Sequence, residues 1–189
     1  MKQFSLFFMA LIGLVLLNSC SKSDSPAVEP EVSISGKWSI TGLGTITDLK
    51  TYDATLEEIA AVSNNKDILK LKDVYSYEFK TDGTYVAGTD SGTWILAADK
   101  KQVTLTSKVN VDSNKKPAVL IFQVFDLAKN SVKLGFKKFS KNASGNFDTT
   151  SLEDFAYFSV GIMGMAGKGG TQADLDKVKT LQGTLNLKR

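Results

Sequence analysis

The chain has 189 residues and a formal net charge of +3, with 23 Lys and Arg residues against 20 Asp and Glu residues. It contains no histidine, which excludes Ser-His and Cys-His catalytic groupings and the usual zinc sites. Its lysines form no basic stripe beyond the pairs Lys100-Lys101, Lys115-Lys116 and Lys137-Lys138, so nucleic acid is not an expected partner. We therefore expect a protein that is not an enzyme and that holds neither a metal nor a cofactor.

The first nineteen residues have the layout of a secretion signal. Met1-Lys2 supplies a positive charge, and a mainly apolar run extends from Phe4 to Leu17. This run is shorter than the roughly 20 apolar residues that a transmembrane helix needs. The segment Leu17-Asn18-Ser19-Cys20 then places an aliphatic residue and a small residue before a cysteine. This arrangement resembles the lipobox of bacterial lipoproteins.

The lipobox resemblance implies that Cys20 becomes the first residue of the mature protein and carries lipid. In that family the cysteine thiol takes a diacylglycerol, and the new amino group is usually acylated. Cys20 is the only cysteine of the chain, and lipidation accounts for a lone cysteine in an exported protein. The alternative is an ordinary signal peptide, or a membrane-anchored helix, with an incidental cysteine. Ser21 stands where an aspartate would indicate inner-membrane retention, so the resemblance favours the outer membrane, in either leaflet.

These signals divide the chain into three parts. Residues 1–19 are expected to be a cleaved signal, residues 20–32 a lipidated N-terminus and flexible tether, and residues 33–189 a single folded domain. The tether prediction depends on Ser21 to Glu31, which is rich in serine, proline and acidic residues and cannot fold by itself. The remaining length is typical of one domain with its own core.

Alternating apolar and polar residues predict β-strands along most of this domain. In Val74 to Lys80 the aromatic residues share one face, and Asp82-Gly83 follows as a hairpin turn. Further strands are expected at Gly36 to Ile46, from Tyr85, at Thr93 to Ala97, Gln102 to Lys108, Ala118 to Leu127, Ser131 to Phe139, and from Leu181 to the C-terminus. About eight short strands predict an all-β antiparallel meander that closes into a barrel, because closure removes the exposed sheet edges.

Two segments depart from the strand pattern. Ala54 to Val62 is predicted to be a short helix, because Thr55 and Glu58 have the spacing of a capping box. Ser140 to Lys179 is predicted to be a long insertion before the last strand. The stretch Phe155 to Met163 within it is strongly apolar, so we expect it to pack against other residues instead of extending into water.

One known family shares several of these features. Gly36 to Gly42 (GKWSITG) is similar to the Gly-x-Trp signature that opens the lipocalin fold, and Tyr77 to Thr106 looks like the lipocalin-like lipoproteins of bacteria. The resemblance implies that Trp38 closes the bottom of the barrel beneath a cation from the last strand, for which Lys188 and Arg189 are the candidates. The second lipocalin signature, Thr-Asp-Tyr late in the meander, is missing from this sequence.

The candidate ligand site lies inside the predicted barrel. It consists of apolar and aromatic residues of the strands and the insertion, namely Tyr77, Phe79, Tyr85, Trp94, Phe122, Met163 and Met165. We interpret Gly161 to Thr171 as an adaptable apolar loop, because methionine is flexible and glycine frees the backbone. The alternative is that its methionines only plug one end of a filled barrel. Two carboxylate pairs, Glu57-Glu58 on the helix and Glu153-Asp154 in a loop, are interpreted as solvated groups.

Two functional hypotheses from different classes remain. In the first, a lipocalin-like barrel is displayed on a membrane through the lipid on Cys20 and binds a small apolar ligand beneath the insertion. In the second, the barrel is filled, and its surface docks to an envelope protein or inhibits another protein. Aromatic and leucine-rich inward positions are common to both, because a filled core and an apolar cavity need the same residues.

Overall fold

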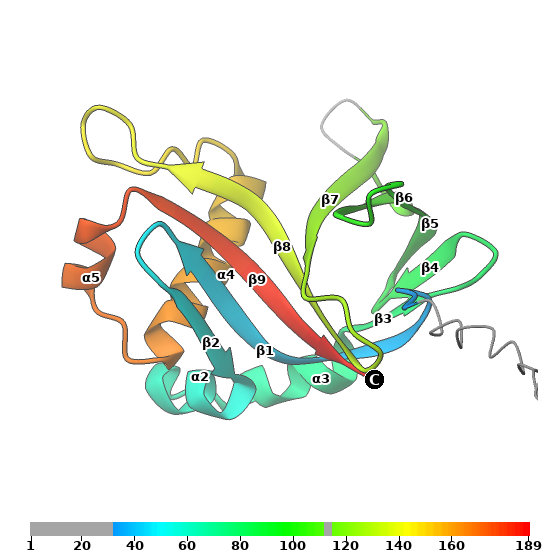
Figure 1. Ribbon diagram of the computed structural model, residues 1–189, viewed down its shortest axis with the longest axis horizontal. Coiled ribbons are helices and arrows are strands. Elements are labelled where there is room, and N and C mark those ends of the chain that lie inside the picture. The colour runs from blue at the N-terminus through cyan, green and yellow to red at the C-terminus, as the bar shows by residue number, and fades with distance from the viewer. Residues whose placement is uncertain (1–31, 112–114) are drawn as a thin grey trace, which may run out of the picture. The chain divides into compact units, whose positions relative to one another are not determined.

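The computed structural model describes residues 32–111 and 115–189. The residues from Val32 to Arg189 form one compact unit, which contains every element described below (Figure 1). The predicted signal peptide, the predicted lipidation site Cys20 and the predicted tether up to Glu31 lie outside the described residues.

The domain is mainly β, with a nine-stranded antiparallel sheet as its framework. The strands are β1 (Gly36–Thr47), β2 (Thr51–Thr55), β3 (Ser76–Phe79), β4 (Thr84–Ala87), β5 (Asp90–Leu96), β6 (Gln102–Val111), β7 (Pro117–Phe125), β8 (Ser131–Ser140) and β9 (Thr180–Lys188). Strands β3 to β9 pair in chain order, and β1 pairs with both β3 and β9. The hydrogen bonds therefore form a ring through eight strands, which confirms the predicted antiparallel meander, although the ring is not a formal barrel.

Strand β1 has three partners, and this explains the strand outside the ring. Its residues Gly36 to Ser39 pair with β3, whereas Gly42 to Ile46 pair with β2 on the same edge. Its other edge pairs with β9, with a register irregularity between Ile40 and Gly42. Strands β2 and β3 therefore diverge from β1 at Ile40 and Thr41, which have no strand partner on this edge. The sequence did not predict β2, because only Tyr52 and Ala54 give its five residues an apolar face.

The predicted short helix is confirmed as α2 (Leu56–Ser63), which begins two residues later and ends one residue later than expected. The Thr55 hydroxyl accepts a hydrogen bond from the Glu58 amide, and the Glu58 carboxylate accepts one from the Thr55 amide, so both halves of the capping box are present. The buried residues Leu56, Ile59 and Ala60 form its apolar face. A 3-10 helix, η1 (Lys66–Lys70), and a single turn, α3 (Leu71–Val74), then lead into β3.

The predicted insertion between β8 and β9 is present, and it contains two helices that the sequence did not predict. It contains α4 (Leu152–Gly167), which begins at the N-cap Ser151, and the short helix α5 (Gln172–Lys177). The interpretation of Gly161 to Thr171 as an adaptable loop is therefore wrong for its first seven residues, which are helical. The apolar stretch does pack as expected, because α4 lies against β1, β2 and β9 (Figure 1).

The glycines of α4 allow the helix to approach the sheet closely. A Cβ atom on Gly164 would lie 2.7 Å from the carbonyl carbon of Gly44, and one on Gly161 would lie 2.5 Å from Leu181 Cδ2. The Gly161 carbonyl also accepts a hydrogen bond from the buried Thr45 hydroxyl. The glycines therefore provide close helix–sheet packing and not backbone freedom, which is why the loop interpretation failed.

The buried Trp38 ring on β1 packs against a cation at the C-terminus. The Trp38 side chain is 0% exposed, and its indole N–H donates to the Ile34 carbonyl at 2.7 Å. The Arg189 guanidinium lies over the Trp38 ring, 4.2 Å from its centroid, and donates to the carbonyls of Ser33 and Ser35. Of the two predicted cations, Arg189 and not Lys188 therefore makes the contact, which holds the first residues of the domain to the last.

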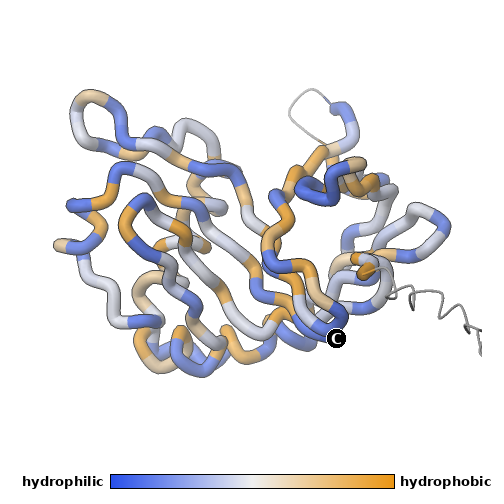
Figure 2. Tube along the Cα trace, in the orientation of Figure 1, coloured by the Kyte–Doolittle hydropathy of each residue, from blue (hydrophilic) through white to orange (hydrophobic). Residues whose placement is uncertain are grey.

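Apolar side chains from the ring strands, α2 and α4 form one core. Its most buried members include Phe79, Phe122, Leu134 and Leu187, which are at most 1% exposed. Figure 2 shows hydrophobic and hydrophilic stretches alternating along the strands, as expected where one face of a sheet is buried. Side chains therefore fill much of the ring interior.

Candidate ligand site in the ring interior

A continuous series of aromatic contacts runs through the ring. The Tyr77 ring on β3 lies 6.1 Å from Phe79 and 6.1 Å from Phe122 on β7, measured between centroids. Because three strands separate β3 from β7, the contact between Tyr77 and Phe122 crosses the interior. The series continues from Phe122 to Phe136 on β8 at 5.1 Å, and from Phe136 to Tyr157 on α4 at 4.7 Å. We call these five residues the aromatic interior.

The structure brings most of the predicted ligand residues together here. Phe79, Tyr85 and Phe122 are buried, and Trp94 contacts Phe79 edge to face at 5.5 Å. Met163 packs against the same core, half-buried. Met165 is also buried, but it lines a separate hollow of about 160 Å³ between α4 and α5. Both methionines lie in the 16-residue helix α4, where residues two positions apart face different directions, so they contact different neighbours.

A polar cluster joins β4, β5 and β6 beside these rings. The Tyr85 hydroxyl donates to Asp90 Oδ2 at 2.7 Å, and the Ser107 hydroxyl donates to Asp90 Oδ1 at 2.5 Å. Burial, and then the hydrogen bond to the Asp90 carboxylate, raise the pKa of the Tyr85 hydroxyl. Tyr85 is therefore neutral at physiological pH, and its hydroxyl is already used within the protein.

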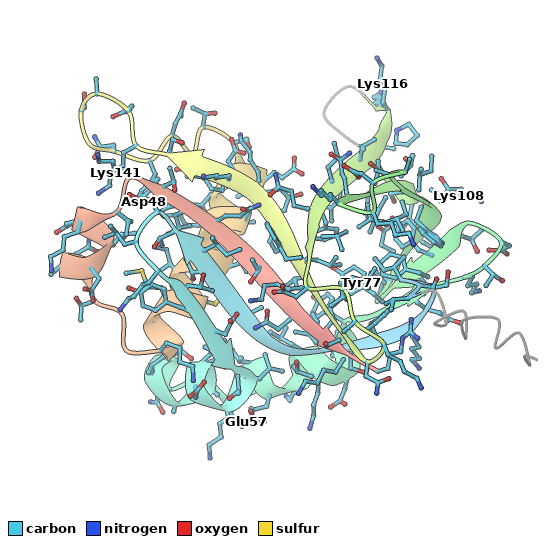
Figure 3. All side chains as sticks on the ribbon, in the orientation of Figure 1. Asp48, Glu57, Tyr77, Lys108, Lys116 and Lys141 are labelled. Atoms are coloured by element: carbon cyan, nitrogen blue, oxygen red, sulfur yellow. The ribbon has the colours of Figure 1, made fainter. Side chains whose placement is uncertain are left out.

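Tyr77 differs from Tyr85, because its hydroxyl has no hydrogen-bond partner within the part of the chain that the structure describes. Its side chain is half-buried among the ring strands (Figure 3). Burial raises the pKa of Tyr77 to about 12, with a smaller contribution from the Asp90 carboxylate. The group is therefore a neutral hydroxyl, available both to donate and to accept a hydrogen bond.

The first turn of α4 fixes the other end of the aromatic interior. The Tyr157 hydroxyl donates to Glu153, and burial together with this bond raises the pKa of Tyr157. The buried Asp154 carboxylate accepts from Lys137 Nζ at 2.6 Å, and this lysine holds the pKa of Asp154 below its usual range. Glu153 and Asp154 lie in the first turn of α4, so their predicted loop position is wrong. Each carboxylate has its own hydrogen-bond partner within the protein.

The second carboxylate pair also shows no catalytic arrangement. Glu58 is bound by Thr55 and by Lys168 Nζ, which is 2.5 Å away, whereas Glu57 lies on another side of the helix. Within residues 32–111 and 115–189, no group of three or more acidic or cysteine side chains is placed to hold a metal ion. None of the helices in these two ranges is both long and apolar enough to cross a membrane.

Sequence reasoning missed three residues of this region. Phe136 and Tyr157 are stacked with an interplanar angle of 20°, but they lie on β8 and α4, so no local pattern links them. Asp90 lies before the predicted strand Thr93 to Ala97, whereas it begins β5 and accepts two hydroxyl hydrogen bonds. The only sequence signal for a polar group at Asp90 was the predicted inward position of Tyr85, whose hydroxyl needs a hydrogen-bond partner.

No protein-family model matches the chain, and no curated protein matches it.

Proposed function

We propose that the chain is a lipid-anchored envelope protein whose lipocalin-like ring binds a small, mainly apolar molecule at the aromatic interior. The observation that carries this proposal is the half-buried Tyr77, whose side chain lies among aromatic rings and whose hydroxyl has no hydrogen-bond partner among the described residues. This hydroxyl can both donate a hydrogen bond to a polar group of a ligand and accept one from it. The membrane anchor in this proposal is the lipid predicted on Cys20.

The surrounding side chains define the ligand's chemistry. Phe122, Phe136 and Tyr157 offer ring faces and edges, which favour a flat or aromatic body. Of Tyr77, Tyr85 and Tyr157, only Tyr77 has a hydroxyl that does not already donate a hydrogen bond, because Tyr85 and Tyr157 donate to carboxylates. A ligand with one polar group, such as a hydroxyl, carbonyl or amine, on an apolar body satisfies both features.

A second candidate function is docking to another envelope protein, and the outer face of β5 to β7 favours it. Ile95 is 70% exposed, Val119 is 51% exposed and Ile121 is 50% exposed. Ile95 and Ile121 flank Thr104 across the three strands, so the exposed apolar side chains are neighbours on one sheet face. Side chains such as Phe79 and Phe122 also fill the ring, as this alternative requires.

Binding of N-phenyl-1-naphthylamine, an apolar probe with one N–H group, tests the first function. We compare the domain of residues 32–189 with its Tyr77→Phe and Tyr75→Phe variants. Removing the Tyr77 hydroxyl should weaken binding about two- to tenfold, because a neutral hydrogen bond contributes about 0.5–1.5 kcal/mol. Tyr75 is 49% exposed two residues earlier, so its variant should bind like the parent. Equal binding by both variants, or no binding at all, would favour docking.

A further inference from the structure

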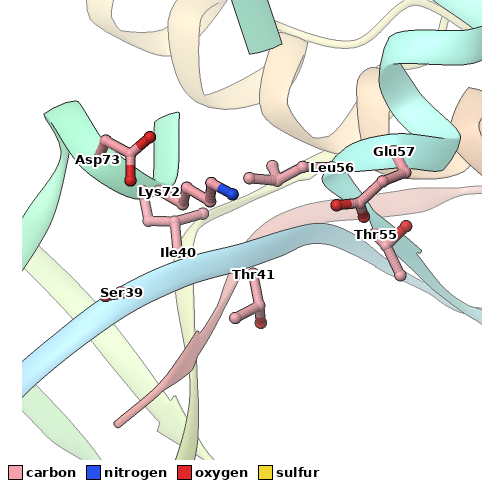
Figure 4. Close-up of a pocket in the computed structure, with 8 residues that line it drawn as sticks. All are labelled: Ser39, Ile40, Thr41, Thr55, Leu56, Glu57, Lys72 and Asp73. Atoms are coloured by element: carbon pink, nitrogen blue, oxygen red, sulfur yellow. The ribbon is translucent and has the colours of Figure 1, made fainter. Parts of the chain in front are cut away.

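The divergence of β2 and β3 from β1 leaves a second hollow, of about 290 Å³, which shares no residue with the aromatic interior (Figure 4). Its lining comes from β1, from the start of α2 and from α3, and consists of Ser39, Ile40, Thr41, Thr55, Leu56, Glu57, Lys72 and Asp73. Ile40 and Leu56 are 5% and 2% exposed, so the base of the hollow is apolar and firmly held in the core. Its other lining side chains are charged or carry hydroxyls.

Two opposite charges face each other across this hollow without meeting. The Lys72 ammonium group extends toward the Glu57 carboxylate in Figure 4, and the lysine lowers the pKa of Glu57, although less than the Glu57 amide and the Thr55 hydroxyl do. No ion pair within 4 Å joins Lys72 to any carboxylate among the described residues. The Glu57 carboxylate is therefore charged at neutral pH, and both side chains are exposed and open to a ligand. Asp73 adds a second carboxylate beside the lysine.

The backbone adds an independent feature at the same place. Ile40 and Thr41 lie between the β3-paired and β2-paired parts of β1, and neither has a strand partner on this edge. The β1–β9 register also skips Thr41. Neither residue is therefore paired with a strand on the side of the hollow, which leaves this edge of β1 open to a short extended ligand.

We propose that this hollow binds a small zwitterion of the amino-acid or short-peptide class, with Lys72 holding its carboxylate and Glu57 its ammonium group. The hollow is near the lower limit of volume for small-molecule sites, which suits a ligand of about one or two amino-acid residues. An ammonium and a carboxylate separated by a peptide match charges that do not touch each other in the protein. The apolar base of Ile40 and Leu56 accommodates a short aliphatic side chain.

Saturation-transfer NMR with L-alanyl-L-alanine tests this site on the full chain in phospholipid nanodiscs. The parent protein should bind the dipeptide, and its N-acetyl and C-terminal amide derivatives should each bind at least about tenfold more weakly, because each loses a charge-assisted hydrogen bond. Lys72→Met should reduce dipeptide binding by a similar factor, and so should Glu57→Gln. Lys66→Met is the matched control, because Lys66 is an exposed lysine on η1 outside the hollow, and it should leave binding unchanged.

Several outcomes would overturn the proposal. They are an absence of dipeptide binding by the parent protein, binding by Lys72→Met equal to that of the parent, or amide binding equal to that of the free dipeptide. The last result would mean that the carboxylates of Glu57 and Asp73 only attract cations. Because no residue of the aromatic interior lines the hollow, failure here leaves the apolar ligand proposal untouched.

Discussion

Replacing Gly164 with alanine adds one methyl group where α4 touches β1. The added Cβ would lie 2.7 Å from the carbonyl carbon, 2.9 Å from the Cα and 2.9 Å from the oxygen of Gly44. All three atoms belong to the backbone of a strand paired on both edges, so they cannot rotate away. Ordinary contacts between such atoms are about 3.5–4 Å, and the helix must therefore move outward by a substantial fraction of an ångström.

The expected loss of stability is about 1–3 kcal/mol, the usual cost of an added methylene in a packed core. Alanine is about 1 kcal/mol better than glycine in a helix, so the propensity effect has the opposite sign. For a domain of this size, about 2 kcal/mol corresponds to a melting temperature lower by about 4–8 °C. The assay is thermal unfolding followed by circular dichroism, with denaturant unfolding for the free energy.

A matched variant separates packing from propensity. Ala156 is exposed on the same helix, so Ala156→Gly should lose only the propensity, about 1 kcal/mol. If Gly164→Ala melts at or above the parent temperature, helix propensity dominates and the close contact with Gly44 does not limit the packing. That result would refute the role assigned to the α4 glycines.

Four further results are expected. Trp38→Ala should cost about 3–5 kcal/mol in unfolding free energy, and a melting temperature near that of the parent would mean that the packing of Trp38 contributes little. Met165→Ser should lower the free energy of unfolding by about 2–5 kcal/mol without changing the binding of N-phenyl-1-naphthylamine. Met163→Ser should weaken binding of this probe. The reverse pattern would contradict the placement of the two methionines. The pKa of Tyr77 rises from 10.0 to about 12 on folding, so its stabilising contribution is complete below pH 10 and is lost as the pH approaches 12. Urea unfolding at several alkaline pH values should therefore show a smaller loss for Tyr77→Phe than for the parent. Cys20→Ser should abolish lipid attachment, as measured by intact mass, and membrane association, as measured by fractionation. A lipidated serine variant would disprove the lipobox assignment.

Local patterns predicted the parts of the fold that depend on neighbours in sequence. The capping box of Thr55 and Glu58, and the Asp82-Gly83 turn in which Gly83 has a φ of 80°, formed as expected because their interactions span at most three residues. The strand alternation likewise predicted the eight-stranded ring. Strand β2 was not predicted because it has only five residues, and its two buried residues give too short an alternation to distinguish a strand from a turn.

The helix α4 was not predicted for a different reason. Its glycines at positions 161, 164 and 167 lower helix propensity, and close contact with the sheet compensates for that loss. A local signal was present, since Ser151 and Asp154 have the spacing of an N-cap and its partner. The site depends still more on tertiary contacts, because the stacking of Phe136 on Tyr157 joins segments that only the folded ring brings together.

Intermolecular NOE spectroscopy with bound N-phenyl-1-naphthylamine tests most directly whether an apolar ligand occupies the aromatic interior. Cross-peaks are expected from the naphthyl protons to ring protons of Tyr77, Phe122 and Tyr157. Cross-peaks confined to Ile95 and Ile121 would place the probe on the exposed outer face of the sheet. That result would contradict ligand binding inside the ring.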